Sequence, residues 1–500
     1  MSKMFMLRGS AAAAALVAAS AAHAELSADR VWEAWQGYSE AAGQSLSAGA
    51  LTRDGKLLTA TDVTISSEID EAAAAIAIPE IAFQEQTDGT VVVTMTDSYS
   101  MTMAMDDAPG ASVDISHPGL RIVVSEGATG LDHAMTAPEV RIALAGIEGM
   151  DEDIPEIAIS IVGLDGNYDV PNDPGGPVSS NFDIAALNLK ADVQDTFTTT
   201  TIDYAVTGLR MRSTGAGLNL IDPDGDPAEA LRAGLALDLN LGYDTQRYNL
   251  VVEEFGDRTA ISGSAMGGES RFAMSSDGIV VSSSSRNTEI TVSGDEIPLP
   301  EVVLTAQQLA FGIALPISAG EDAQEFSMLL RLVDAAVPED VWAMLDPAGQ
   351  IPRTPATAIL DLTGQLVLAA DLLSDDTAML MMMAGPMGLG QIESLDMRDL
   401  QLRIGGAELT GSGSFVFDNT DLETIPGLPR PEGAVEFVLK GGNALLDTLV
   451  NMGLVPEDEA MGARMVLALF ARPGEGPDEL ISKIEIREDG GIYANDMRVQ

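Results

Sequence analysis

Three aspartates at alternate positions, Asp222, Asp224 and Asp226, resemble the beginning of a calcium-binding loop. Such a loop also needs a glycine at its sixth position and a bidentate glutamate at its twelfth. This stretch has Pro227 at the sixth position and an alanine at the twelfth. Asp226, the proline after it and Glu229 instead match the residues that open a helix, so we predict a helix beginning at Pro227. Weak calcium binding to this loop is the alternative that the sequence leaves open.

Other residues that could carry chemistry are few. Asp165, Asn167 and Asp169 repeat the alternate spacing but lack the glycine and the glutamate. His117 and His133 have no zinc-binding spacing, and the chain has neither a G-x-S-x-G signature nor a cysteine. Both histidines are therefore predicted to lie in surface loops. We predict no catalytic, cofactor-binding or metal-binding residue and hence no enzyme; a carboxylate-dependent hydrolase is the less favoured alternative.

Methionine is the one enriched residue type that suggests a binding role. The stretch 91–105 alternates apolar with hydroxyl residues, and its apolar face carries four methionines: Met95, Met101, Met103 and Met105. With Trp342 on a later helix, these are the residues that we predict to line an apolar ligand site. Ordinary core packing is the favoured alternative. Cuprous copper is least favoured, because neighbours on one strand face lie about 6.6 Å apart and do not converge on one ion.

The N-terminus has the features of a secretory signal peptide. Lys3 and Arg8 precede an apolar run that ends in a small-residue cleavage signal, so cleavage is predicted before Glu25. The run is shorter than the roughly 18 apolar residues that a membrane span requires. We therefore expect residues 1–24 to be removed and the protein to be periplasmic.

The chain is strongly acidic. It has 77 acidic and 26 basic residues, and its formal net charge is −51 at pH 7. Nucleic acid and anionic membrane surfaces require basic patches, so both are excluded as partners. A surface rich in carboxylates favours a salty medium, where counterions screen the repulsion.

The hydrophobic pattern predicts a mainly β (α+β) protein, with long twisted antiparallel sheets packed against a few amphipathic helices. One phrase, proline followed by glutamate and an aliphatic residue, is predicted to mark strand starts at Pro79, Pro138, Pro155 and Pro300. Helices are predicted near residues 29–42, 338–345, 443–453 and 456–472, with Asn443 as the N-cap of the third. The length suggests two domains, 25–295 and 296–500, or one long sheet.

Several segments resemble a known family. They are the helix "VWEAWQGY", the segment "VPEDVWAMLDPAGQIPRTPATAILDLTG" and "GGNALLDTLVNMGL" followed by a closing hairpin. These resemble uncharacterised exported proteobacterial proteins, domain of unknown function 2125. The pattern is also distantly similar to AsmA-type and YdgA-type envelope proteins, and that resemblance implies sheets that wrap apolar grooves.

The leading hypothesis is a non-enzymatic envelope protein that holds an apolar, lipid-like ligand or a protein partner. The alternative is a purely structural or scaffolding periplasmic protein whose sheet faces are filled by side chains.

Overall fold

One antiparallel sheet dominates the structure. The computed structural model describes residues 25–499 except 42, 70–71, 106–108, 151–153, 174, 222–224, 385–387 and 426–427. The predicted signal peptide, Asp222 and Asp224 thus lie outside the described residues. Strands make up 62% of the structure and helices 14%, so the predicted mainly β class is confirmed.

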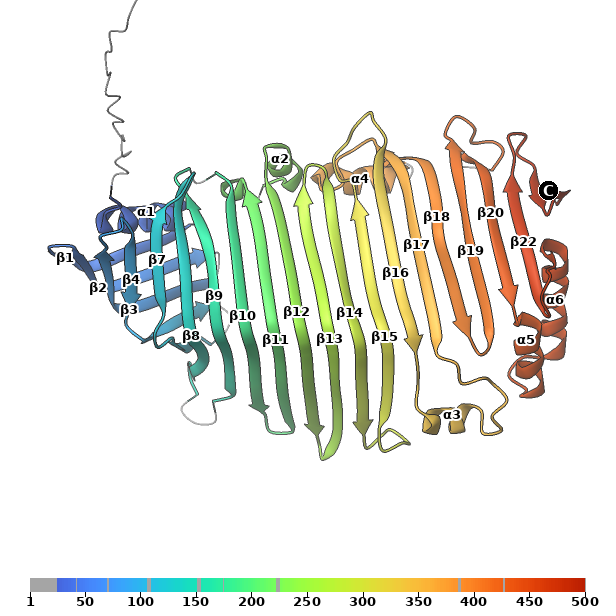
Figure 1. Ribbon diagram of the computed structural model, residues 1–500, viewed down its shortest axis with the longest axis horizontal. Coiled ribbons are helices and arrows are strands. Elements are labelled where there is room, and N and C mark those ends of the chain that lie inside the picture. The colour runs from blue at the N-terminus through green and yellow to red at the C-terminus, as the bar shows by residue number, and fades with distance from the viewer. Residues whose placement is uncertain are drawn as a thin grey trace, which may run out of the picture.

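The strands of the N-terminal third form the narrow end of the sheet in Figure 1. They are β1 (Gln44–Asp54), β2 (Leu57–Ile69), β3 (Ala72–Glu85), β4 (Val91–Met95), β5 (Ser98–Met105), β6 (Ala111–Ser116), β7 (Arg121–Glu126) and β8 (Gly130–Ile147). The strands of the middle of the sheet are β9 (Glu156–Pro171), β10 (Val178–Gln194), β11 (Thr198–Ala216), β12 (Ala236–Glu254), β13 (Asp257–Ser275), β14 (Gly278–Gly294) and β15 (Val302–Leu315). They include the three longest strands, β11, β12 and β13, with 19 residues each.

The remaining strands complete the sheet after β15. They are β16 (Gln324–Ala335), β17 (Ala356–Leu368), β18 (Gly390–Ile404), β19 (Ala407–Asp418), β20 (Arg430–Lys440), β21 (Arg472–Pro473), β22 (Glu479–Ile486), β23 (Ile492–Ala494) and β24 (Met497–Arg498). Tight turns join many of them. At Phe255-Gly256 and Gly405-Gly406 both turn residues have positive φ, the conformation that two-residue hairpins require.

The topology is a meander in which each long strand pairs with the next (Figure 1). β4 and β5 together form one interrupted strand along β3, and β7 and β6 form the next one along β8. The predicted division near Asp295 falls between β14 and β15, which pair along 279–292 and 302–315.

Helices lie at the ends and rims of this sheet. They are α1 (Ala28–Ala41), η1 (Leu218–Leu220), α2 (Pro227–Arg232), α3 (Glu339–Leu345), α4 (Asp375–Ala384), α5 (Gly442–Asn451) and α6 (Glu457–Phe470). In α2 the Ala228 N–H donates to the Asp226 carboxylate at 2.8 Å, so the predicted helix start is confirmed.

The predicted N-cap of α5 is wrong. Gly441 caps the helix, and the carboxylate of Asp478 accepts hydrogen bonds from the N–H groups of Asn443 and Ala444. The sequence hid this cap because its carboxylate lies 35 residues away.

A row of left-handed residues crosses the sheet and interrupts the strands at one level. Its members have φ between 46° and 70°: Asp62, Gly163, Gly208, Gly267, Asn287 and Asp334. Glycine, asparagine and aspartate are the residue types that tolerate this conformation. Each lies where the ladder of paired residues skips a position; for example, Gly163 stands opposite the unpaired Ala185. We call this row the crease.

The crease explains the proline phrases. Pro155 and Pro300 precede β9 and β15 as predicted, but Pro79 and Pro138 lie inside β3 and β8, so that prediction was wrong for these two. Both sit where the ladder is interrupted, opposite the crease residues Asp62 and Gly163. A proline is tolerated there because no backbone donor is needed.

The crease also shifts the alternation of side chains by one residue. In β11, apolar residues occupy alternate positions up to Val206 and then resume at Leu209 and Met211. In a regular strand, Val206 and Leu209 are three positions apart and would face opposite sides of the sheet. The left-handed Gly208 between them offsets this difference, so the two side chains face the same side. Apolar side chains from both halves therefore share one face of the sheet.

The buried core lies under α1. Val31 and Trp32 of α1 pack with Phe83, Val93 and Leu131 in one cluster, and all five side chains are nearly inaccessible. This cluster covers β2, β3, β4, β7 and the beginning of β8, so α1 closes the apolar face at the narrow end of the sheet.

Candidate functional site: an open apolar face of the sheet

The same apolar face continues beyond α1 as cross-strand rows of mostly apolar side chains. One row follows the pairing from β10 to β18 above the crease: Phe182, Met211, Leu241, Ser270, Ser283, Phe311, Leu330, Leu360 and Leu400. Its two serines hydrogen-bond to each other at 3.0 Å. A parallel row below the crease contains Ile159, Leu189, Tyr204, Tyr248, Gly263, Ile290 and Leu304.

The opposite face is polar, and several of its charges are paired. Arg212 binds Asp183, Arg210 binds Asp244 and Arg271 binds Asp238, each at 2.8 Å.

The hydrogen bond from Arg271 holds the pKa of Asp238 below its usual value. This face therefore suits water, whereas the other suits hydrocarbon.

Aromatic rings lie across glycines on the apolar face. A Cβ added to Gly268 would lie 2.2 Å from the Tyr243 ring, and one added to Gly263 would lie 2.4 Å from the Tyr248 ring. Phe326 covers Gly364 in the same way. Because each ring lies over a glycine of the neighbouring strand, it projects little from the sheet, and the apolar face stays comparatively even.

At the α1 end, a buried histidine links the closed core to this face. His133 accepts a hydrogen bond from the Trp35 indole N–H at 2.9 Å, and its ring stacks on Tyr168 at 4.6 Å. Tyr168 stacks in turn on Phe182, the first member of the upper row. Burial lowers the pKa of His133 to about 4, so the ring is neutral at neutral pH.

The predicted surface positions of both histidines were wrong. His133 lies in β8 and is fully buried, because α1 packs above it. His117 lies in the turn between β6 and β7 but is only 2% exposed, and its ring packs edge-on against Tyr99. Local sequence suggested loops in both places because it contains no information about the helix and strands that cover them.

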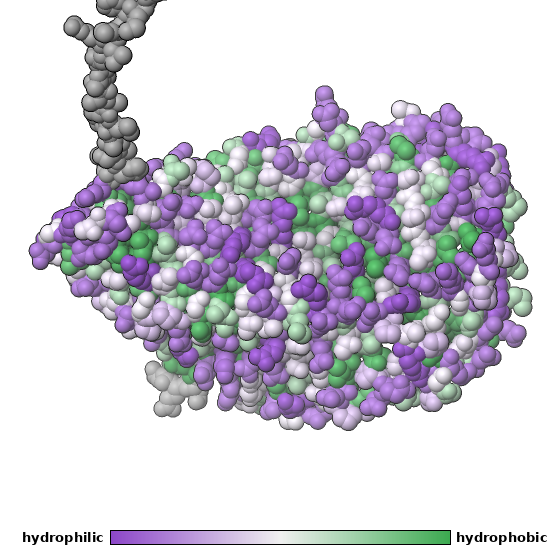
Figure 2. Space-filling view, viewed as in Figure 1, coloured by the Kyte–Doolittle hydropathy of each residue, from purple (hydrophilic) through white to green (hydrophobic). Residues whose placement is uncertain are grey.

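Beyond α1 the apolar face is open. Met211, Leu241 and Phe311 are 37%, 43% and 41% exposed, although they continue the face that is fully buried under α1. An uncovered apolar surface of this kind is typical of a binding site. The face of the molecule that Figure 2 shows is mostly hydrophilic over the middle strands.

One part of this face is a cavity of about 510 Å³ beside α3, lined mainly by apolar side chains. β16 and β17 stop at the crease, and α3 occupies the place below them (Figure 1). Its walls are formed by strand residues from both sides of the crease and by α3, which forms the roof. The large apolar residues among them are Ile290, Leu304, Leu309, Leu332, Trp342, Leu345 and Ile404. The cavity is within the size range of small-molecule sites.

A buried carboxylate holds this roof. Asp346 is 1% exposed and accepts hydrogen bonds from the N–H groups of Gln350 and Ile351 and from the Arg353 guanidinium. Burial alone would raise the pKa of Asp346, but these hydrogen bonds outweigh it and lower the pKa to about 2. The Arg353 guanidinium also lies 4.6 Å from the centre of the Trp342 ring, which fixes the ring in the cavity wall.

The five residues predicted to line an apolar site do not lie together. Trp342 lines the α3 cavity. Met95 packs against the closed core under α1, whereas Met101 and Met103 are half-buried on β5. Met105 ends β5 opposite Ala72. The leucines and isoleucines of the cavity were missed; their signal was the alternation that shifts phase at the crease.

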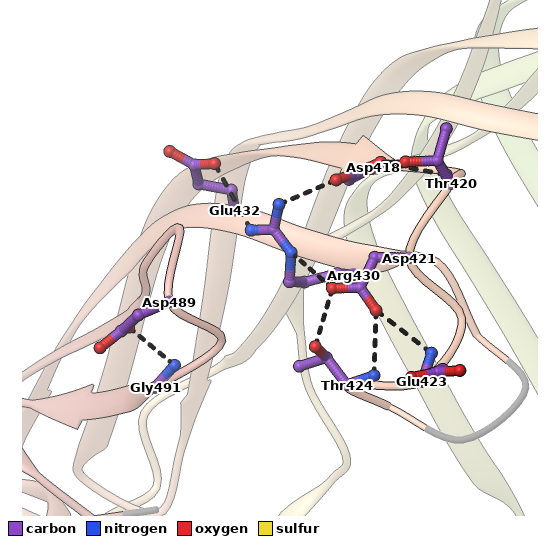
Figure 3. A network of polar contacts seen from close by, with 9 residues as sticks. All are labelled: Asp418, Thr420, Asp421, Glu423, Thr424, Arg430, Glu432, Asp489 and Gly491. Carbon is purple, nitrogen blue, oxygen red and sulfur yellow. Dashed lines mark hydrogen bonds and ion pairs between the residues drawn. The ribbon is translucent and has the colours of Figure 1, made fainter.

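The densest charged cluster is a loop clamp (Figure 3). The Arg430 guanidinium, at the start of β20, contacts the carboxylates of Asp418, Asp421 and Glu432 at 2.9–3.6 Å. Asp421 also accepts hydrogen bonds from the N–H groups of Glu423 and Thr424. These contacts tie the β19–β20 loop to the strand and leave the cluster structural.

In the described part of the chain, no three or more histidine, aspartate and glutamate side chains are grouped so that they could hold a metal ion. In the same residues, no helix has the length and hydropathy needed to cross a membrane.

The comparisons with known proteins identify the family. A model of uncharacterised proteins conserved in bacteria, DUF2125, matches residues 245–499, from within β12 to the end of the sheet. No curated protein and no solved structure matches the chain. The similarity to AsmA-type and YdgA-type proteins thus stays a prediction. Since the family model covers just over half of the residues, the chain belongs to this family, domain of unknown function 2125.

Proposed function

We propose that this protein is a non-enzymatic periplasmic protein that holds an apolar, lipid-like ligand on the open face of its sheet. The observation that carries the proposal is the contrast in burial along one continuous face. Under α1 the face is closed, whereas the row through Leu241, Phe311 and Leu330 is exposed. Hydrocarbon on this row would remove apolar area from water, which stabilises a complex by about 25 cal/mol per Å².

The alternative, a purely structural protein, requires filled sheet faces. The exposed row and the cavity beside α3 favour ligand binding over that alternative. The ion pairs on the opposite face also favour ligand binding on the apolar face, because they keep the opposite face in water.

The test is native mass spectrometry and lipid extraction of protein purified from periplasm. We expect a co-purified lipid, and we expect Leu330→Asp to abolish it. Leu329→Asp is the matched control, because Leu329 neighbours Leu330 but pairs with Gly312 on the polar face. Protein that carries no lipid, or equal lipid in both variants, would contradict the proposal.

A further inference from the structure

We propose that the cavity beside α3 takes the methyl end of a single unbranched hydrocarbon chain and that it ignores the chain's headgroup. This inference deepens the proposed function and rests on it. It specifies which end of the hydrocarbon chain enters the cavity and which end points away from it. The proposed function requires only that some part of the apolar face binds a ligand.

The charges in the cavity wall disfavour a charged ligand group. Among the described residues that line it, the charged ones are Glu339 and Arg353. The two lie 3.5 Å apart, and Arg353 also binds the buried Asp346 at 2.7 Å. Both charges of the wall are therefore already paired, and recruiting Arg353 to a ligand carboxylate or phosphate would leave Asp346 as a buried charge without its partner. A charged headgroup is thus disfavoured inside, whereas a terminal methyl group costs nothing.

The face above the cavity is long enough for one acyl chain. β15 presents Leu309 in the cavity wall and then Phe311, Ile313 and Leu315 at alternate positions up to its end. These six residue steps span about 20 Å. That length exceeds the roughly 15 Å of one leaflet of a bilayer's hydrocarbon core, so one acyl chain fits along it.

The upper end of this path is polar. Leu231 of α2 packs with Ile317 and Leu235 in a second small core, which closes the rim of the sheet near the end of β15. Above this core Arg232 pairs with Asp371 at 3.2 Å at the molecular surface. A headgroup at this end meets solvent and polar side chains, so the chain runs with its methyl end towards α3.

The experiment uses stearic acid that carries a nitroxide at carbon 16 or at carbon 5, added to the full chain. Trp342 is one of three tryptophans, and the other two lie in α1. The fluorescence of Trp342 is obtained by subtracting the emission of the Trp342→Phe variant from the emission of the unchanged protein. We expect the carbon-16 label to quench this difference more strongly than the carbon-5 label, and the methyl ester to bind as well as the acid.

The chain length gives a second readout. Shortening an unlabelled competitor by two methylenes should weaken displacement by up to roughly 15-fold. Stronger quenching by carbon 5, or a clear preference for the acid over the ester, would overturn the inference.

Electron paramagnetic resonance of the same labels separates the two levels. Immobilised label without quenching of Trp342 would refute the cavity but leave the proposed function standing. Label that stays freely tumbling would refute the proposed function as well. Immobilised label, with stronger quenching by the carbon-16 label than by the carbon-5 label, would support both the inference about the cavity and the proposed function.

Discussion

The α1-closed end and the open middle of the sheet are built from the same pattern and have opposite fates. Both have apolar residues at alternate strand positions, and both are cut by the crease. At the closed end Phe83 meets Trp32 and Trp35 edge-on at 6.0 and 5.4 Å and is fully buried. In the middle, Phe311 stays 41% exposed. A single amphipathic helix therefore makes the difference between a core and a surface.

The largest expected effect tests this contrast with one substitution at two places. Phe83→Ala should lower the free energy of unfolding by about 3–5 kcal/mol, because it leaves a cavity under α1. Phe311→Ala should lower it by less than about 1 kcal/mol, because the side chain is half in water already. Urea unfolding measures both. Equal losses would mean that the open face is covered in solution, which would undo the comparison.

An intermediate effect tests the buried histidine at the junction of the two regions. His133 has a folded pKa of about 4 against a usual value of 6.5. The unfolded chain thus binds the proton more tightly, and the stabilisation is complete above pH 6.5 and lost as the pH falls towards 4. The shift corresponds to about 3 kcal/mol.

The measurement is urea unfolding at pH 7 and pH 4.5 for the protein and for His133→Gln. The variant should lose the part of the pH dependence that belongs to His133, while the many carboxylates contribute alike to both proteins. An unchanged pH dependence would show that the ring is not buried neutral under α1.

The smallest effect sharpens the role of glycine in each region. Gly37 lies in α1 with negative φ, and an added Cβ meets nothing within 4 Å. Gly37→Ala should therefore stabilise the helix by about 0.5–1 kcal/mol. Gly268→Ala is the contrasting variant and should destabilise, because its Cβ would meet the Tyr243 ring. Thermal unfolding measures both, and a gain at Gly268 would argue against the flat ring.

Much of the local structure could be predicted from the sequence. The alternation in 91–105 predicted strands, and Asp226-Pro227 predicted the start of α2, because strands and helix starts depend on neighbours within a few residues. The strand interruption was visible only as Gly, Asn or Asp within long β runs. That these residues lie at one level becomes apparent only when strands as far apart in the chain as β2 and β16 are part of the same sheet.

The candidate site was much less predictable. Trp342 was identified, but the leucines and isoleucines beside it come from segments between residues 290 and 404. Met95 has the same local pattern as an exposed strand methionine, yet α1 closes over it. The alternation marked which side chains share a face and gave no sign of which face a helix covers.

The acidic composition, the mainly β class and the positions of many strands and helix starts could be predicted from the amino-acid sequence, because these depend on composition and short-range periodicity. Only packing between distant segments buries the histidines, brings Asp478 to the start of α5 and places α3 over a cavity. It also leaves one apolar face half closed and half open. Burial depends on what packs across from a residue, and here that partner lies up to a hundred residues away in the chain.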